Sequence, residues 1–308
     1  MISALMIIAG LSALFSLTAR TLACRLAPAT AALVFTMASV TIAAASSGLL
    51  AVTGWYGAAR FGPIADAGGW STGLLARTAP VPLRFSMCAG LGVVVITVRV
   101  AHLWVRRVCE LRAAQRSWPS AGHDDGITVT AERRVNAFAV EGTATTRRIV
   151  LTEGLLRALP NPDLQRAVIE HEHSHLRHHH LLYRLAVETA AYANPILRPI
   201  TRVVDEALEA WADDDASHAT APAAVATAIV TVALTRVSER PNRIALAIAE
   251  SVTVRRVERL LHPTRTNNAG AIVGAGVAIG AVIVLGVGCR ETETFFEALR
   301  ATGQLLAR

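Results

Sequence analysis

The chain has 308 residues, of which 53% are hydrophobic and only 17% are charged, and its mean hydropathy is +0.42. Soluble domains carry about 25% charged residues, so this composition argues against an ordinary soluble protein and favours a membrane protein. The net charge is +7. No nucleic-acid recognition module is visible, so we expect the arginines to flank membrane spans and not to bind nucleic acid directly.

Four apolar stretches are long enough to cross a bilayer, which requires about 20 residues in a helix. We expect three membrane helices within residues 1–105, at about 2–19, 31–54 and 83–104, and a fourth at 267–289. Glycines at GxxxG spacing in the fourth stretch suit close helix packing in lipid.

The arginines predict which side of the membrane each segment occupies. Arg20 and Arg25 lie between the first two spans, and Arg106 opens an arginine-rich segment after the third. Short arginine-rich segments stay in the cytoplasm. We therefore expect residues 106–266 to form a cytoplasmic domain of a multi-pass protein in a bacterial cell membrane. Both termini would lie outside, with residues 290–308 as a short extracytoplasmic tail.

Two further segments allow more than one interpretation. In the external loop at about residues 54–83, we expect Trp55, Tyr56 and Trp70 to anchor the chain at the membrane interface. Residues 220–237 are apolar enough to be considered as an additional span. The arginines that follow favour a helix buried in the cytoplasmic domain.

The segment AVIEHEHSHLRHHHLL, residues 167–182, contains an H-E-x-x-H motif that begins at His171. Asn161 is a candidate N-cap for a helix through this segment. On a helix, His171 and His175 lie one turn apart on one face and can bind one metal together. Glu172 would lie beside the metal, where a general base takes a proton from the attacking water.

The remaining histidines of this run are expected to play other roles. His173 points away from the metal-facing side, and His178, His179 and His180 are expected to extend the same helix. His178 would lie on the metal-facing side, one turn beyond His175. We expect it to contact a ligand or solvent and not to be a ligand itself.

A catalytic zinc site needs a third protein ligand. The segment VVDEALEAWADDDASHA, residues 203–219, contains E-x-x-A-D-x-x-A and offers Glu209 as that ligand. Asp213, one turn later, would accept a hydrogen bond from the second nitrogen of a ligating histidine. Asp205 and Glu206 remain alternatives for the third ligand. The sequence thus predicts one Zn²⁺ per chain.

Short strands are expected upstream of the motif, at residues 127–130, 136–140 and 148–151. The segments NAFAVEG, RRIVLTEGLLRAL, LQRAVIEHEHSH and EAWADDDA together resemble the integral-membrane gluzincin metalloproteases. Two branches are similar, the HtpX and CAAX-prenyl-protease type and the beta-lactam sensor-transducers BlaR and MecR. The resemblance covers about residues 125–262, and the three-plus-one span layout is closest to the sensor-transducers.

This resemblance implies the roles of the site residues: zinc ligands His171, His175 and Glu209, catalytic base Glu172, and supporting residue Asp213. It also implies that Asn136 and Ala137 lie on the strand edge that binds the substrate. Residues 290–308 leave no room for the penicillin-binding domain that the sensor-transducers carry. An antibiotic is therefore not the expected signal.

The expected fold is a mainly α membrane protein with four transmembrane helices and a cytoplasmic α+β zincin-like metalloprotease domain between helices three and four. The expected function is that of a zinc metalloendopeptidase. It would cut a polypeptide. The two alternatives are a cytoplasmic transcriptional repressor, with its own chain as a further substrate, and misfolded membrane proteins in quality control. A non-proteolytic metal sensor or transporter would explain the histidine run but not Glu172, and it predicts charged residues deep in the spans, which are almost absent.

Overall fold

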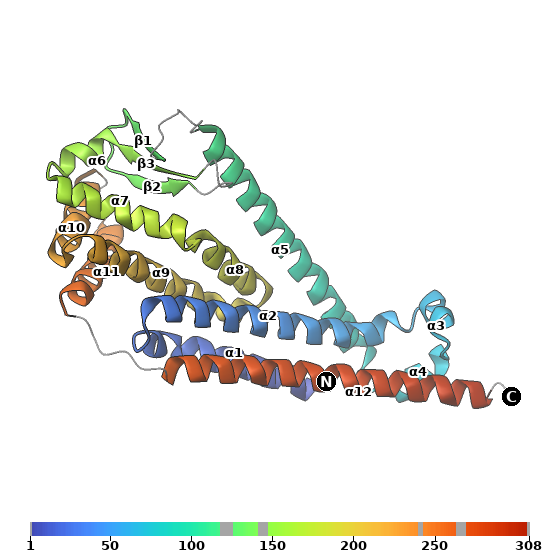
Figure 1. Ribbon diagram of the computed structural model, residues 1–308. Helices are drawn as coiled ribbons and strands as arrows, with labels where there is room; N and C mark the ends of the chain where they lie inside the picture. The colour runs from blue at the N-terminus through green and yellow to red at the C-terminus, as the bar shows by residue number, and fades with distance from the viewer. Residues whose placement is uncertain (1, 118–125, 141–146, 240–242, 263–268, 307–308) are drawn as a thin grey trace.

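The protein is described by a computed structural model in which residues 2–117, 126–140, 147–239, 243–262 and 269–306 are described. Within these residues, four helices are long and apolar enough to cross a membrane. They are α1 (Ile2–Ala23), α2 (Pro28–Ala58), α5 (Leu83–Ser117) and α12 (Ala269–Leu306). In Figure 1, α1, α2 and α12 run side by side, whereas α5 leaves this bundle and rises toward the sheet.

These four helices coincide with the four expected apolar stretches and extend beyond them. α5 continues to Ser117, and α12 has 38 residues and continues to Leu306. The expected tail at residues 290–308 is therefore a continuation of the α12 helix as far as Leu306. The boundary expected between residues 266 and 267 lies outside the described residues. Gly274 of α12 faces Val34 of α2 so closely that an added Cβ would clash, which agrees with the predicted close packing.

The segment between α2 and α5 contains two short helices, α3 (Gly62–Gly68) and α4 (Thr72–Thr78). Tyr56 and Trp70 are almost fully buried in a cluster with Phe296 of α12, and only Trp55 remains exposed. The expectation that all three aromatic residues anchor the loop in the lipid interface is therefore wrong for Tyr56 and Trp70. Their rings pack inside the protein because the end of α12 covers them.

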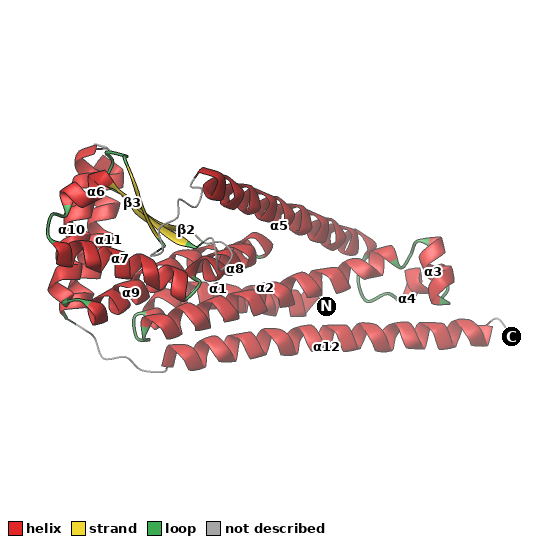
Figure 2. Cartoon of the chain, turned by 45° about the horizontal axis from the view of Figure 1, so that its top comes forward, coloured by secondary structure: helices red, strands yellow, loops and turns green. Residues whose placement is uncertain are grey.

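Three short strands form one small sheet with the order β1-β3-β2. β1 (Ile127–Thr130) pairs in parallel with β3 (Arg148–Thr152), and β2 (Ala137–Val140) pairs with β3 in antiparallel orientation. The three predicted strands are confirmed to within one residue at each end. β3 is buried along its length, and β2 is an edge strand that lies against α7 (Figure 2).

The helices that follow the sheet are α6 (Glu153–Ala158), α7 (Pro162–Arg177), α8 (His180–Ala193), α9 (Arg198–Ala219), α10 (Pro222–Glu239) and α11 (Arg243–Leu261), with a 3-10 turn η1 (Pro195–Leu197) between α8 and α9. α10 packs against α7 through Val225 and Ala228. The prediction of a packed helix at residues 220–237 is thus confirmed.

One hydrophobic core joins the long apolar helices α1, α2 and α12 to the helices α8 and α9 of the expected cytoplasmic domain. Val187 and Ala190 of α8 and Ile200 of α9 belong to the same buried cluster as Phe15 of α1 and Phe35 of α2. α2 packs extensively against both α8 and α9. The expected boundary at residue 106 therefore does not separate two independent cores.

Candidate metal centre

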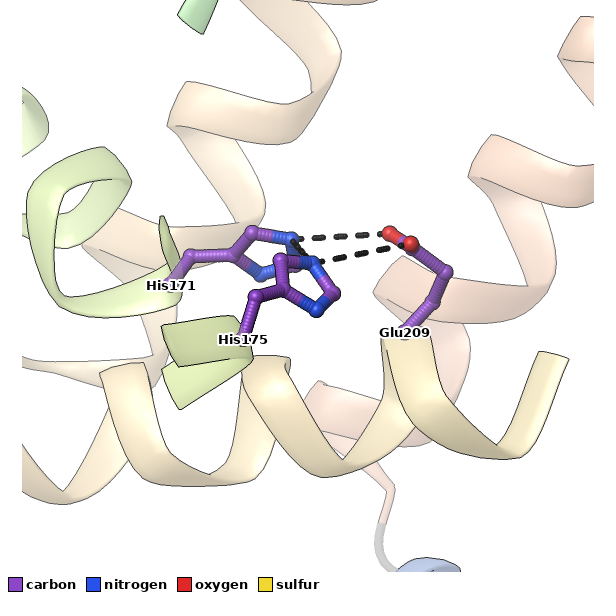
Figure 3. A group of neighbouring side chains, drawn as sticks. All are labelled: His171, His175 and Glu209. Carbon is purple, nitrogen blue, oxygen red and sulfur yellow. Dashed lines mark hydrogen bonds and ion pairs between the residues drawn. The ribbon is translucent and has the colours of Figure 1, made fainter. Parts of the chain in front are cut away.

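α7 carries the H-E-x-x-H motif, and its start is fixed by the sequence. The Asn161 side chain accepts a hydrogen bond from the Asp163 backbone N–H, and Pro162 occupies the first turn. The i to i+4 spacing brings the rings of His171 and His175 together, with their Nε2 atoms 3.2 Å apart. Both rings are largely buried and point toward α9 (Figure 3).

Glu209 of α9 completes a group of three potential metal ligands. Its Oε2 lies 3.5 Å from His171 Nε2, and its Oε1 lies 3.7 Å from His175 Nε2. Ligand atoms that bind one tetrahedral zinc at about 2.0–2.1 Å are separated from each other by about 3.3 Å. The two nitrogens have this spacing, and one ligand atom from each of the three residues lies within 4.8 Å of the others. Two imidazoles and one carboxylate at this separation fit a zinc ion.

Asp213 is fully buried one turn after Glu209, and its Oδ1 lies 3.0 Å from His171 Nδ1. Arg256 of α11 donates two hydrogen bonds to the same carboxylate, at 2.7 and 2.8 Å. The Asp213 carboxylate thus lies where the sequence predicts it, against the nitrogen of His171 that faces away from Glu209. This contact fixes the orientation of the His171 ring.

The chain does not continue as one helix through the histidine run. α7 ends at Arg177, and His179 has a φ of 54°, in the left-handed region that a non-glycine residue adopts only under tertiary constraint. The prediction that His178, His179 and His180 extend the helix is therefore wrong. The turn brings the ring of His180 against the ring of His175, and the two Nδ1 atoms lie 2.6 Å apart.

This turn also removes His178 from the metal-facing side. His178 Nε2 contacts Asp215 at 2.9 Å, and its ring stacks on Trp211. Ser174 donates a hydrogen bond to the same Asp215 carboxylate. His178 therefore joins α7 to α9 away from the three ligand candidates, and His173 is half-buried outside the cavity lining.

The two alternative third ligands lie away from the histidine pair. Asp205 accepts a hydrogen bond from Arg184 at 3.1 Å, and Glu206 is exposed and pairs with Arg20 at 3.8 Å. Arg184 also donates to Glu209 Oε1 at 2.7 Å. Among the described residues, Glu209 is the carboxylate that groups with both histidines.

The charges around the three ligand candidates shift their pKa values in opposite directions. Burial lowers the pKa of His171, but Asp213 and Glu209 outweigh it and raise that pKa to about 9. Burial and the neighbouring His171 lower the pKa of His175 to about 3. Burial opposes ionisation of Glu209, but His171 and Arg256 hold its pKa well below the usual range. The site therefore offers an ionised carboxylate and a neutral His175 at neutral pH.

A cavity of about 830 Å³ opens beside these residues. Glu172 lines it together with His171 and His175, and Ala137 of β2 forms part of the opposite wall. Most of the remaining lining residues are apolar, and they come from α5, α10 and α11 as well as from β2, α6, α7 and α8. Asn136 precedes β2, and its backbone N–H donates to Thr152 Oγ1 at 3.0 Å.

Residues 99–251 match the profile of peptidase family M48. This part of the chain is an M48 metallopeptidase domain. M48 is a zinc metallopeptidase family, and the histidine pair and Glu209 lie inside the matched segment. Searches of curated proteins and of solved structures gave no match.

Sequence reasoning missed three residues that contact the ligand candidates of the M48 domain: His180, Arg184 and Arg256. Arg256 lies in the sequence RRVERLL, residues 255–261, inside the region of about residues 125–262 that the family resemblance covers, so a signal for it existed. Arg184 carried no signal, because its contact depends on how α8 packs beside α9. The contact of His180 with His175 depends on the turn at His179, which the sequence did not predict.

Proposed function

We propose that the protein is a zinc-dependent membrane metalloendopeptidase that hydrolyses peptide bonds. The observation that carries this proposal is the group formed by His171, His175 and Glu209, whose potential ligand atoms all lie within 4.8 Å of one another. The M48 domain supports the same reaction class. One zinc ion would be held by these three side chains, with Asp213 and His180 fixing the two rings.

A bound zinc ion would act as a Lewis acid and would lower the pKa of water to about 7. In our proposal Glu172 is the catalytic base. Its carboxylate lines the cavity one residue after His171, from where it accepts the proton of the attacking water and delivers it to the leaving amine. Arg184 and Arg256 line the same cavity and balance the negative charge that gathers there.

We propose that the substrate binds as an extended strand along the edge formed by Asn136, Ala137 and the rest of β2. β2 pairs with β3 on one side, and its other side faces α7 and the cavity. Strand addition would use backbone hydrogen bonds for affinity and would leave the apolar wall to receive alternate side chains.

We further propose that the domain acts on the cytoplasmic side of the membrane and that both termini lie outside, because Arg20, Arg25 and Arg106 flank the spans on the domain's side. The span layout resembles that of the sensor-transducers, which favours regulated proteolysis of a transcriptional repressor. The chain itself is a further substrate in this proposal. Quality control of membrane proteins is the alternative.

The test uses the full chain in proteoliposomes with zinc and unfolded casein as the substrate. Cleavage by the wild type that is lost in Glu172→Gln would support the proposal. Glu170→Gln is the matched control, because Glu170 lies on the same helix outside the cavity lining. Retention of cleavage by Glu172→Gln would refute the role of Glu172. Full zinc content in His175→Ala would refute the ligand assignment.

A further inference from the structure

A second cavity, of about 380 Å³, lies at the end of the long helices opposite the metal centre (Figure 1). Three parts of the chain meet there: the end of α2, the segment between α3 and α4, and α12 beyond its uncharged run. Cavities that bind small molecules have volumes of about 300 Å³ or more. This cavity is thus large enough for a small ligand and is separate from the proposed peptidase site.

Three aromatic rings line the cavity. The rings of Trp70 and Phe296 are almost fully buried, with centroids 4.8 Å apart, and the ring of Trp55 lies 6.4 Å from each of them. Tryptophan attracts cations through the face of its ring. One such contact exists already, because the Arg300 guanidinium lies 5.4 Å from the centroid of the Trp70 ring. Trp55 is 41% exposed and offers a second ring to a ligand.

Two carboxylates lie at the rim of the same cavity. Glu293 and Glu297 are one helical turn apart on α12, and both side chains are exposed and line the cavity. Neither carboxylate forms an ion pair with a residue that the structure describes. Arg300 follows on the same helix face, but its guanidinium donates to the Gly68 carbonyl oxygen at 2.7 Å. Two carboxylates and one guanidinium leave the cavity with an excess of one negative charge.

The cavity lies where α12 becomes polar. Cys289 is the last residue of the uncharged run of α12 and lines one end of the cavity, and Arg300 lines the other end. Eleven residues of helix separate them, or about 16 Å. The polar headgroup layer is about 5–8 Å thick on each side of the bilayer core. A cavity that starts at the end of the apolar run can therefore receive either a lipid headgroup or a solute from the water.

We infer that this cavity binds an organic quaternary ammonium group, with Trp55 against its methyl groups and with Glu293 and Glu297 balancing its charge. The rings favour this ligand over a metal ion, because a quaternary ammonium group has an apolar surface and binds aromatic faces. The choline group of a lipid and a free quaternary ammonium compound share this chemistry. The inference goes beyond the proposed peptidase function and does not depend on it.

The test uses the full chain labelled with 5-fluorotryptophan in dodecyl maltoside, a detergent without charge or ammonium group. The fluorine resonance of Trp55 is assigned by its loss in Trp55→Phe. Choline is the probe, and 3,3-dimethylbutanol is its uncharged counterpart, because carbon replaces nitrogen in the same shape. We expect a saturable shift of the Trp55 resonance with choline and an affinity at least about fivefold weaker for the alcohol. Equal affinities for the two compounds, or no shift with choline, would overturn the inference.

The role of the carboxylates is tested in the double variant Glu293→Gln, Glu297→Gln. Its affinity for choline should fall by about fivefold or more, and its affinity for the alcohol should not change. Glu291→Gln is the matched control, since Glu291 lies on the same helix outside the cavity lining and should leave the affinity for choline unchanged. Equal choline affinity in the double variant and the wild type would overturn the inference. The resonance of the buried Trp70 reports whether each variant is folded, and the comparison of the two compounds requires no variant.

Nanodiscs distinguish the two sources of the ligand. If a lipid headgroup is the ligand, added choline should shift the Trp55 resonance in phosphatidylglycerol nanodiscs but not in phosphatidylcholine nanodiscs, where the cavity is already filled. If a free compound is the ligand, choline should shift the resonance in both lipids. Each of these outcomes supports the inference, and the absence of a shift in both lipids would contradict it.

Discussion

Replacing Asp213 by asparagine would remove one negative charge from the site and keep the shape of the side chain. The fully buried Asp213 carboxylate receives two hydrogen bonds from Arg256 and contacts His171 Nδ1 at 3.0 Å. Asparagine has one acceptor oxygen, so its NH₂ group would face a donor. Each lost hydrogen bond to a charged group costs about 1.5–3 kcal/mol.

We expect Asp213→Asn to be destabilised by about 2–4 kcal/mol, since Arg256 loses one of its two hydrogen bonds to residue 213 and the buried charge that it pairs with. Its remaining ion pair, with Glu209 at 3.4 Å, is longer. Zinc affinity should fall by about 10- to 100-fold, because the His171 ring loses the carboxylate that orients it. The assay is competition for zinc against a chelator of known affinity with detergent-solubilised full chain. Thermal unfolding followed by tryptophan fluorescence reports stability in the same samples.

Asp214→Asn is the matched control. Asp214 is adjacent and partly exposed, and it pairs with Arg259 at 2.9 Å outside the ligand group. A partly exposed ion pair contributes about 0–1 kcal/mol, so zinc affinity should stay within about twofold of the wild type. Equal zinc affinity in Asp213→Asn and the wild type, or equal losses in both variants, would refute the reasoning.

Three further outcomes are expected. His180→Phe fills the space of the imidazole but removes the contact with His175 Nδ1. Zinc affinity in the chelator competition should fall by about tenfold or more, while the unfolding temperature changes little. Unchanged affinity would exclude a role of His180 in orienting His175. Asp213 and Glu209 raise the pKa of His171 to about 9, so zinc that binds below pH 9 must displace a proton from this residue. The affinity for zinc should therefore decrease by up to about tenfold per pH unit as the pH falls from 9 to 7. Calorimetry in buffers of different ionisation enthalpy should find about one proton released from this residue, and a pH-independent affinity would contradict the assignment. Gly154→Ala should lower the unfolding temperature of the chain, since the new Cβ would collide with the Arg133 backbone carbonyl, and a wild-type melting curve would show that this loop can move freely.

The sequence predicted the parts of the site that depend on local periodicity. The i to i+4 spacings in α7 and α9 place His171 beside His175 and Glu209 beside Asp213 whatever the rest of the fold does. The pairing of the two helices followed only from the chemical requirement for a third zinc ligand. The small sheet was predictable because its strands are rich in β-branched residues between turns.

The turn at His179 could not be predicted, because a left-handed histidine is stabilised by tertiary contacts. Arg147 lies 3.1 Å from the His179 ring, and His180 is fully buried against His175 and Trp211. A run of histidines carries no breaker such as glycine or proline. Periodicity therefore favoured one long helix where the chain forms two.

Hydropathy located the four long apolar helices but not what packs between them. α8 and α9 are amphipathic and too polar to be mistaken for spans, yet Val187 and Ile200 are buried with Phe15 in the core of the membrane helices. The burial of Trp70 under the end of α12 has the same cause. Hydropathy measures preference for an apolar environment and does not distinguish lipid from protein.

The most direct test of the central claim compares new protein N-termini across the proteome in cells that express either the wild type or Glu172→Gln. The substitution leaves the three proposed zinc ligands in place and removes the base. The account predicts termini that arise only with the wild type. A single site in a transcriptional repressor would support regulated proteolysis, and many sites in membrane proteins would support quality control. Identical sets of termini in the two strains, with equal zinc content in the two purified proteins, would contradict the account.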